Sequence, residues 1–173
     1  MTWRVDGDHH GDESSKIRWE AIPYTAGRTL DIGCGPYKVL PTVIGVDNGT
    51  QWGSHGIDVK SSASDLSLFA DGSCDCVYSS HLLEHIYPDD VPATLQEWAR
   101  VVKKGGYIVL YLPDEDEYPK VGDKYANKDH KWNVNYDQVV AYMDTVKRDW
   151  DLIDFQKRNQ NDEYSLYFVF QLQ

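Results

Sequence analysis

The residues near the start of the chain that are best suited to chemistry are acidic side chains around a glycine turn. Asp31, Gly33 and Gly35 stand in the sequence Leu-Asp-Ile-Gly-Cys-Gly-Pro. Asp47 ends the short apolar run of residues 43–46. Glycines let a backbone turn sharply and approach a ligand, because they carry no Cβ atom. An acid at the end of a second strand can accept hydrogen bonds from both hydroxyls of a ribose. This stretch therefore predicts a site for a nucleoside-type cofactor.

The spacing of the glycines and the charge of the turn discriminate among such cofactors. The turn matches neither the GxGxxG pattern of dinucleotide-binding sites nor the GxxxxGK[ST] pattern of P-loops. The carboxylate of Asp31 would repel a phosphate group and would attract a cation. S-adenosylmethionine (SAM) carries a sulfonium and an ammonium group, so the turn favours SAM over NAD or ATP.

A second group of chemically capable residues follows a predicted strand over residues 74–80. His81, Glu84 and His85 form the sequence His-Leu-Leu-Glu-His, which also fits the HxxEH pattern of inverted zinc peptidases. Two histidines with this spacing would share one face of a helix, as metal ligands do. Because the cluster follows a strand, we expect Ser80 and His81 at the carboxyl end of a sheet, where open α/β sheets bind ligands. We interpret the cluster without a metal.

Two histidines are candidates for a catalytic base. His130 lies in the polar segment of residues 113–135, and loops of this length are often functional. A histidine titrates near neutral pH and can accept the proton of a hydroxyl group. His85 is the second candidate. The alternative roles are a surface position for His130 and, for His85 or Glu84, hydrogen bonds that hold the local backbone in place.

The composition is typical of a globular protein and disfavours a membrane-spanning segment and a nucleic-acid partner. The 173 residues are 41% hydrophobic, which is enough for one domain with a core. The chain contains neither a long apolar run nor the apolar centre of a signal peptide. Its three cysteines do not form a disulfide framework, which favours a reduced, cytoplasmic protein. A net charge of −11 disfavours nucleic acid as a partner.

The pattern of apolar residues predicts strands and helices in alternation. Helices are expected over residues 89–104, where an apolar stripe recurs at helical spacing, and from residue 135. The strands are expected at residues 29–32, 43–46, 57–59, 74–80, 107–112, 150–155 and 163–172. Because only residues 36–42 join the first two strands, the N-terminal half has no room for its usual helices.

The N-terminal segment of residues 1–28 is treated as separate from the domain of residues 29–173. A short helix is expected to begin at Ser14 or Ser15 and to be broken at Pro23. Its aromatic residues either cover the cofactor as a lid or pack against the sheet; they are Trp3, Trp19 and Tyr24. A sheet face that this segment leaves uncovered would allow a homodimer.

Four motifs in order resemble those of class I SAM-dependent methyltransferases, especially the small type 11 group. They are LDIGCGP, VIGVDN, DGSCDCVYSSHLLEH and EWARVVKKGGYIVLYLPD, and together they cover about residues 30–114. The resemblance implies an α/β, Rossmann-like, mostly parallel seven-stranded sheet with a C-terminal antiparallel hairpin. It also implies SAM as cofactor, with Ser80 and His81 beside its methionine end. It further implies that Asp65, or alternatively Ser62, accepts a hydrogen bond from the adenine amino group of SAM.

The function expected from these features is transfer of a methyl group from SAM. The acceptor atom would be an oxygen or nitrogen of a small-molecule or saccharide-type compound. A SAM-binding module without catalysis is one alternative. An NAD-dependent oxidoreductase is the other, and the absence of a third glycine in the turn disfavours it.

Overall fold

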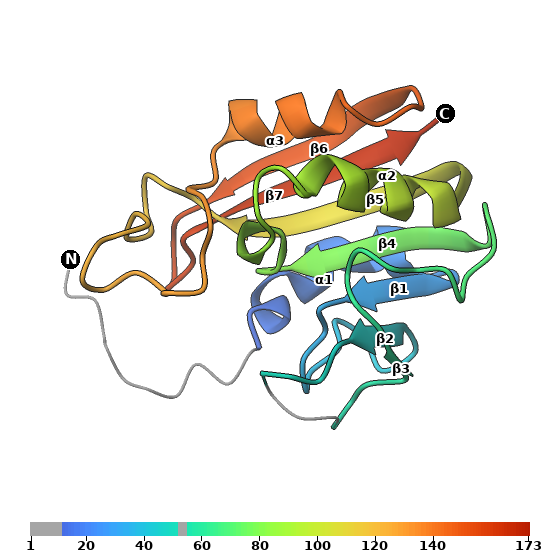
Figure 1. The fold of residues 1–173 in the computed structure, drawn as a ribbon, viewed down its shortest axis with the longest axis horizontal. Helices are drawn as coiled ribbons and strands as arrows, with labels where there is room; N and C mark the ends of the chain where they lie inside the picture. Colours follow the sequence, from blue (N-terminus) through green and yellow to red (C-terminus); the bar gives the residue numbers. More distant parts are fainter. Residues whose placement is uncertain (1–11, 52–54) are drawn as a thin grey trace.

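The computed structural model describes residues 12–51 and 55–173 (Figure 1). The predicted covering role of Trp3 lies outside these residues. The strands are β1 (Thr29–Ile32), β2 (Ile44–Asp47), β3 (Val59–Lys60), β4 (Cys74–Ser80), β5 (Val102–Pro113), β6 (Trp150–Arg158) and β7 (Ser165–Leu172). The helices are α1 (Ser14–Thr25), the 3₁₀ turn η1 (Leu83–His85), α2 (Val91–Val101) and α3 (Tyr136–Met143).

All of the described strands belong to one seven-stranded sheet in the order β3-β2-β1-β4-β5-β7-β6. The pairs from β3 to β5 are parallel, whereas β7 is antiparallel to both β5 and β6. This arrangement confirms the predicted Rossmann-like, mostly parallel α/β sheet with a C-terminal antiparallel hairpin. The carboxyl ends of β1, β2 and β4 meet at one edge, which is where α/β sheets place ligands.

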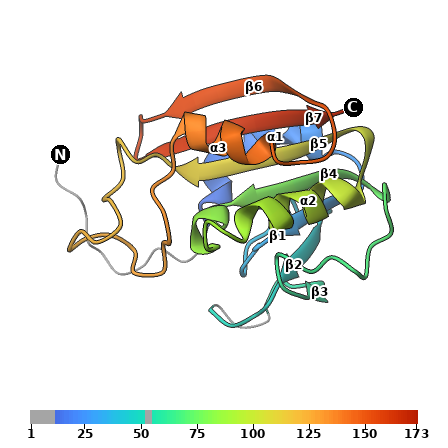
Figure 2. The same cartoon turned by 45° about the horizontal axis from the view of Figure 1, so that its top comes forward.

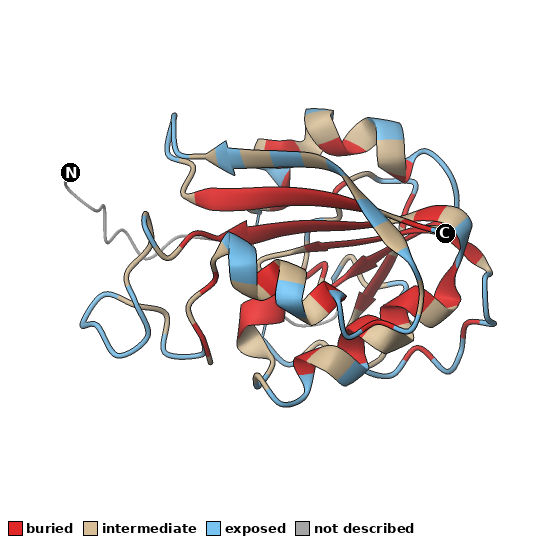
Figure 3. Cartoon of the chain, turned by 90° about the horizontal axis from the view of Figure 1, so that it is seen from above, coloured by how far each residue is buried: buried red, intermediate tan, exposed pale blue. Residues whose placement is uncertain are grey.

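Helices cover both faces of the sheet (Figures 1 and 2). On one face, α1 buries Ile17 and Ala21 against the central strands. On the other face, α2 and α3 contribute buried side chains to a larger apolar cluster that includes Leu95 and Trp98. Figure 3 shows that the central strands are buried along most of their length. Helix α1 of the N-terminal segment therefore covers the sheet face for which the sequence predicted either this segment or a partner chain as the cover.

The N-terminal half of the sheet is built with few helices, as predicted. Among the described residues between β1 and β3, none is helical.

Across the described part of the chain, no helix combines the length and apolar character that crossing a membrane requires.

The boundary between α2 and β5 differs from the prediction. The helix ends at Val101 instead of residue 104, and β5 begins at once with Val102 paired to Cys74. The pairing continues because Gly106 has no side chain: a Cβ atom there would lie 2.6 Å from the carbonyl oxygen of Asp75. Of the two glycines that were expected to stop the helix, Gly106 instead allows β5 to pass close to β4.

The predicted break of α1 at Pro23 is also wrong, since the helix continues to Thr25. Side chains hydrogen-bond to carbonyl groups near its C-terminal end and stabilise the last turns. Thr25 Oγ1 donates to the carbonyl of Ala21 at 2.9 Å, and Tyr167 Oη donates to that of Glu20 at 3.2 Å.

Candidate active site

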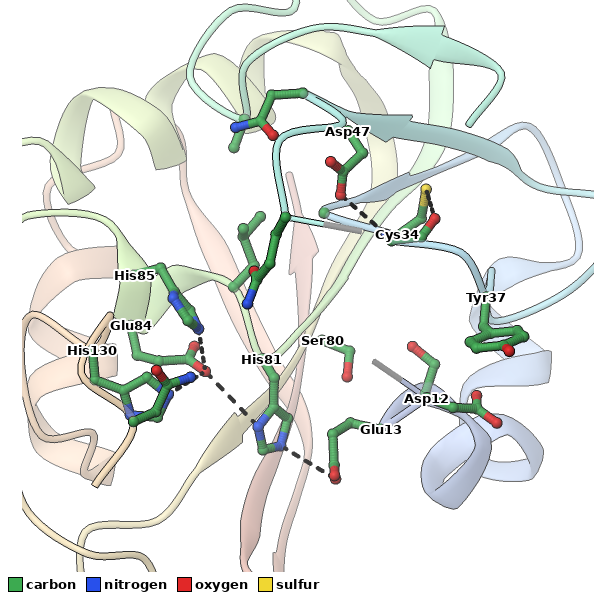
Figure 4. A pocket seen from close by; sticks show the side chains of 18 of the residues that line it. Asp12, Glu13, Cys34, Tyr37, Asp47, Ser80, His81, Glu84, His85 and His130 are labelled. Atoms are coloured by element: carbon green, nitrogen blue, oxygen red, sulfur yellow. Dashed lines mark hydrogen bonds and ion pairs between the residues drawn. The ribbon is translucent and has the colours of Figure 1, made fainter. Parts of the chain in front are cut away.

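A cavity of about 680 Å³ opens at the carboxyl ends of β1, β2 and β4 (Figure 4). Its volume lies in the range typical of small-molecule sites. Its lining comes from the glycine turn after β1, the end of β2, the segment after β4, the start of α1 and the long loop after β5. The cavity therefore joins parts of the chain that are far apart in sequence.

The glycine turn is tied to the end of β2. Gly33 adopts a φ of +72° and donates its backbone N–H to the carbonyl of Val46 at 2.8 Å. A Cβ atom on Gly33 would lie 2.7 Å from the side chain of Leu82. Gly35, with a φ of +52°, donates its N–H to Asp47 Oδ2 at 3.0 Å. Both glycines line the cavity and expose backbone to it.

Asp47 also lines the cavity at the end of β2. Its Oδ1 atom accepts a hydrogen bond from the N–H of Gly49 at 2.7 Å, in addition to the bond from Gly35. Each carboxylate oxygen has a second lone pair, so Asp47 can still accept hydrogen bonds from a ligand. Its assignment to the ribose stays a prediction that this position favours.

Asp31 does not lie where the sequence analysis placed it. Its side chain is 1% exposed, does not line the cavity, and accepts a hydrogen bond from the N–H of Val39 at 2.7 Å. The neighbouring Leu30 and Ile32 point into the opposite core cluster, because side chains alternate along a strand. Burial raises the pKa of Asp31 to about 7. Direct contact of this carboxylate with a bound cation is therefore not supported.

Asp65 likewise lies away from the cavity. Its side chain is exposed and accepts a hydrogen bond from the N–H of Ser67 at 3.1 Å. The alternative, Ser62, is also exposed and outside the lining. Ala63 is the residue of this segment that reaches the cavity. The predicted adenine contact of Asp65 is thus not supported. The motif spacing located the correct segment but did not show which of its residues faces the cavity.

Ser80 and His81 lie at the end of β4 and line the cavity, as predicted from the topology. His81 adopts a φ of +48°, which is unusual for a residue other than glycine. Its Nε2 atom shares a hydrogen bond of 2.9 Å with Ser165 Oγ, and its backbone N–H donates to the carbonyl of Tyr111 at 2.8 Å. These bonds fix the imidazole at the cavity wall. Burial lowers its pKa to about 4.

Three residues form a tight cluster at the other end of the cavity, hereafter the Glu84 cluster: Glu84, His85 and His130. Glu84 Oε1 lies 3.8 Å from His85 Nε2 and 3.6 Å from His130 Nε2. Glu84 has no exposed side-chain surface. Burial raises the pKa of Glu84 to about 8 and lowers that of His130 to about 3. Figure 4 shows the two imidazoles directed at the carboxylate.

The long loop after β5 is held against η1, which explains how His130 reaches Glu84. The backbone N–H of Lys131 donates to the carbonyl of Glu84 at 2.8 Å. The indole N–H of Trp132 donates to the carbonyl of Leu83 at 3.2 Å. His130 is therefore 8% exposed and lines the cavity, which contradicts the alternative of a surface histidine.

Sequence analysis did not identify several polar residues that line the cavity. They are Asp12, Glu13, Lys16, Asn48, Tyr118, Asn127 and Tyr164. Glu13 and Lys16 form an ion pair of 2.8 Å at the start of α1. Tyr164 could have been found, since residues that precede an antiparallel strand lie at the same edge as the ends of the parallel strands. The contribution of α1 depends on tertiary packing and left no sequence signal.

Comparison with known proteins agrees with this geometry. The family model of a methyltransferase domain matches residues 30–110. No curated protein matches the chain. Among solved structures, a SAM-dependent methyltransferase from Archaeoglobus fulgidus has 20% identity and a TM-score of 0.68, over 95% of this chain and 94% of that one.

Two bacterial SAM-dependent methyltransferases are similarly related in fold. The one from Mesorhizobium loti has 14% identity and a TM-score of 0.65, over 90% of this chain and 96% of that one. The one from Clostridium acetobutylicum has 12% identity and a TM-score of 0.66, over 98% and 94%. The matched domain and the shared fold support a SAM-dependent methyltransferase of class I, with SAM as the methyl donor.

The cavity fits that donor. Gly33 and Gly35 leave the backbone open to a ligand, and a side chain at Gly33 would collide with Leu82 at the cavity wall. Asp47 offers acceptor atoms at the end of β2, and the cavity continues from there past Ser80.

Proposed function

We propose that the protein transfers the methyl group of SAM to an oxygen or nitrogen atom of a small-molecule or saccharide-type acceptor. The proposal is supported by one observation above all: a single cavity joins the glycine turn and Asp47 to the Glu84 cluster. Methyl transfer requires donor and acceptor to be aligned in one space that excludes water. A continuous cavity with two chemically different ends meets this requirement.

The first end of the cavity would hold SAM. The backbone of Gly33 and Gly35 would lie directly beside SAM. Asp47 would accept hydrogen bonds from the ribose hydroxyls. Ser80 and His81 would border the methionine part of SAM. When bound, SAM supplies a methyl group that is electrophilic because it is attached to a positively charged sulfur.

The second end would hold the acceptor. It is bordered by the Glu84 cluster and by the side chains of Tyr118, Asn127 and Tyr164. Aromatic rings and hydrogen-bonding groups together suit a sugar or another polar small molecule. The net charge of −11 argues against a nucleic-acid acceptor, because such binding depends on neutralising phosphates.

His130 and His85 are the predicted proton acceptors of this reaction. Both reach the second end of the cavity from different elements, His85 from η1 and His130 from the loop after β5. A proton acceptor is needed only where the acceptor atom loses a proton, so alignment of the two substrates supplies the larger part of the acceleration.

Thermal unfolding with added ligands, followed by an acceptor screen, tests the proposal. We expect SAM and its demethylated product, S-adenosylhomocysteine, to raise the midpoint temperature of unfolding. At a ligand concentration a hundred times the dissociation constant, the free energy of unfolding should increase by about 2.7 kcal/mol. NAD should have no effect. A mass-spectrometric screen of hydroxylated and aminated small molecules should then detect a methylated product. Stabilisation by NAD alone would favour the oxidoreductase alternative, and SAM binding without any methylated product would favour a non-catalytic module.

A further inference from the structure

The carboxylate of Glu84 is buried in an unusual environment. Neither of its oxygens has a hydrogen-bond partner within the described residues. Three imidazoles surround Oε1 at similar distances: His81 Nδ1 and His85 Nε2 at 3.8 Å, and His130 Nε2 at 3.6 Å. These separations are too long for hydrogen bonds. Because an unpartnered buried carboxylate is costly, the arrangement calls for a further partner.

The separations fit an ion placed among the side chains. A zinc ion binds imidazole nitrogens and carboxylate oxygens at about 2.1 Å, so two ligand atoms on a tetrahedral ion lie about 3.4 Å apart. One ligand atom from each residue of the Glu84 cluster lies within 4.8 Å of the others. The observed separations, from 3.6 Å to at most 4.8 Å, are wider than those of a bound site, so side-chain rotation must bring the three ligand atoms together around an ion.

We propose that Glu84, His85 and His130 bind a divalent transition-metal ion at the acceptor end of the cavity. Two imidazoles and one carboxylate are a ligand set of catalytic zinc sites and of non-haem iron sites. Imidazole ligands favour zinc, iron, cobalt or nickel over magnesium and calcium, which prefer oxygen ligands. All three residues line the cavity, so the ion would keep an open coordination position toward it.

This site differs from the HxxEH motif in the sequence. That motif predicts that His81 and His85 share one face of a helix, but η1 spans only Leu83–His85 and His81 is hydrogen-bonded to Ser165. The second imidazole of the Glu84 cluster comes instead from His130, which the loop brings in through Lys131 and Trp132. The tertiary structure therefore assembles a ligand set that no local motif contains.

The role of the ion rests on the proposed function. A Lewis acid at the acceptor end would orient a hydroxyl or amine and make its proton more acidic, so that the proton could pass to solvent water as the methyl group is transferred. His85 and His130 would then act as ligands of the ion instead of proton acceptors. If methyl transfer requires a metal ion, the two histidines act as ligands; if it does not, they act as proton acceptors.

Metal titration of the full-length chain, prepared without a histidine tag and stripped with a chelator, tests the proposal. We expect calorimetry with ZnCl₂ and CoCl₂ to give one ion per chain, and bound Co²⁺ to show visible absorption bands of low coordination number. Glu84→Gln and His130→Ala should each weaken binding at least about tenfold, the loss typical when a metal site loses supporting interactions. Glu84→Gln keeps the size of the side chain, so circular dichroism should report an intact fold.

Two controls address histidines outside the site. His55 is exposed and does not line the cavity, so His55→Ala should bind the ion like the parent chain. A chain with both His9→Ala and His10→Ala should also keep the stoichiometry and affinity. The proposal is overturned if the parent chain binds no ion, if Glu84→Gln and His130→Ala bind as tightly as the parent, or if removal of His9 and His10 abolishes binding.

The same samples separate this proposal from the proposed function. SAM binding to the metal-free chain, measured by calorimetry, depends on the first end of the cavity and not on the Glu84 cluster. Failure of metal binding with intact SAM binding would reject the metal site alone. Failure of SAM binding with intact metal binding would reject the proposed function and leave the ion site standing.

Discussion

At the scale of single residues, burial changes the role that a charge pattern predicts. The carboxyl group of Asp31 suggested an electrostatic contact with a cationic cofactor, yet it is enclosed beside Val39 and its pKa is raised to about 7 by burial. In the folded state this carboxyl group is protonated over a pH range in which the unfolded chain is ionised. Asp31 therefore affects the pH dependence of stability more directly than it affects ligand binding.

Asp31→Asn should alter stability in a pH-dependent way. The folded state holds a proton on Asp31 between its ordinary pKa of 3.8 and about 7, so its favourable contribution is full below pH 3.8 and is lost as the pH rises through about 7. The stability of Asp31→Asn relative to the parent should increase over this window, by at most about 4 kcal/mol. Urea unfolding at a series of pH values measures this. The exposed Asp89→Asn serves as a control for removal of a surface carboxylate. A difference between Asp31→Asn and the parent that does not change with pH would contradict the account.

Asp47→Ala and Asp65→Ala form a matched pair for the cofactor site. Asp47 lines the cavity, whereas Asp65 is exposed outside it. Loss of hydrogen bonds to a charged acceptor costs about 1.5–3 kcal/mol, so Asp47→Ala should weaken SAM binding roughly 10- to 100-fold. Asp65→Ala should leave the dissociation constant unchanged. Calorimetry measures both, and weaker binding of SAM to Asp65→Ala would restore the adenine contact that the motif spacing suggested.

Sequence patterns predicted well which residues line the cavity at the ends of strands, and predicted poorly which way a side chain within a segment points. Ser80 and His81 were located because topology places the end of β4 at the ligand edge. The side chain of Asp31 faces away from the cavity because side chains alternate along β1. Asp65 lies in an irregular segment, where motif spacing does not show which residue faces inward. Burial of His130 depends on a loop whose path only tertiary contacts define.

At the scale of elements, the loop after β5 is the part that completes the site. It reaches η1 through Lys131 and Trp132, and it closes on itself where the N–H of Glu115 donates to the carbonyl of Val134 at 2.8 Å. These bonds hold His130 at the cavity without helix or strand. The stability of the site therefore depends on a few hydrogen bonds at the base of a long loop.

Trp132→Phe should loosen this loop while keeping an aromatic ring. The change removes the indole donor to the carbonyl of Leu83, which is worth about 1 kcal/mol. Hydrogen exchange should therefore show weaker protection of the Lys131 amide. Trp150→Phe is the matched control, because it removes an indole bond of 3.1 Å to the carbonyl of Met143 at the end of α3. Equal protection of Lys131 in the two variants would contradict the role given to Trp132.

Gly106→Ala tests the close approach of β5 to β4. An added Cβ atom would lie 2.6 Å from the carbonyl oxygen of Asp75, so backbone must shift. Overpacking of this kind typically costs about 1–3 kcal/mol. Gly106 is not among the glycines with a positive φ, so the loss reports the close approach of the two strands. Thermal unfolding should show this loss relative to the parent chain, and an unchanged midpoint of unfolding would contradict the packing described here.

Periodicity predicted most elements because the apolar stripe of α2 and the alternation in β7 are long. The end of α2 was missed because Lys103 and Gly105 are typical of helix ends, whereas pairing of Val102 with Cys74 begins a strand there. Propensity describes the isolated segment, and the partner strand decides between the two structures.

At the scale of the whole molecule, the order of the strands makes the site. β1, β2 and β4 bring the glycine turn, Asp47 and His81 to one edge, and the antiparallel β7 starts at that same edge with Ser165 beside His81. Helix α1 covers one sheet face, and Glu13, which directly precedes the helix, lines the cavity. The seven-stranded sheet thus builds the end of the cavity proposed for SAM, and the flanking segments build the end proposed for the acceptor.

A crystal structure of the complex with S-adenosylhomocysteine tests the central claim most directly. The account predicts density for the ligand inside the cavity, with the ribose hydroxyls at hydrogen-bonding distance from Asp47 and the sulfur directed toward the Glu84 cluster. Density at another surface, or a ribose that makes no contact with Asp47, would contradict it.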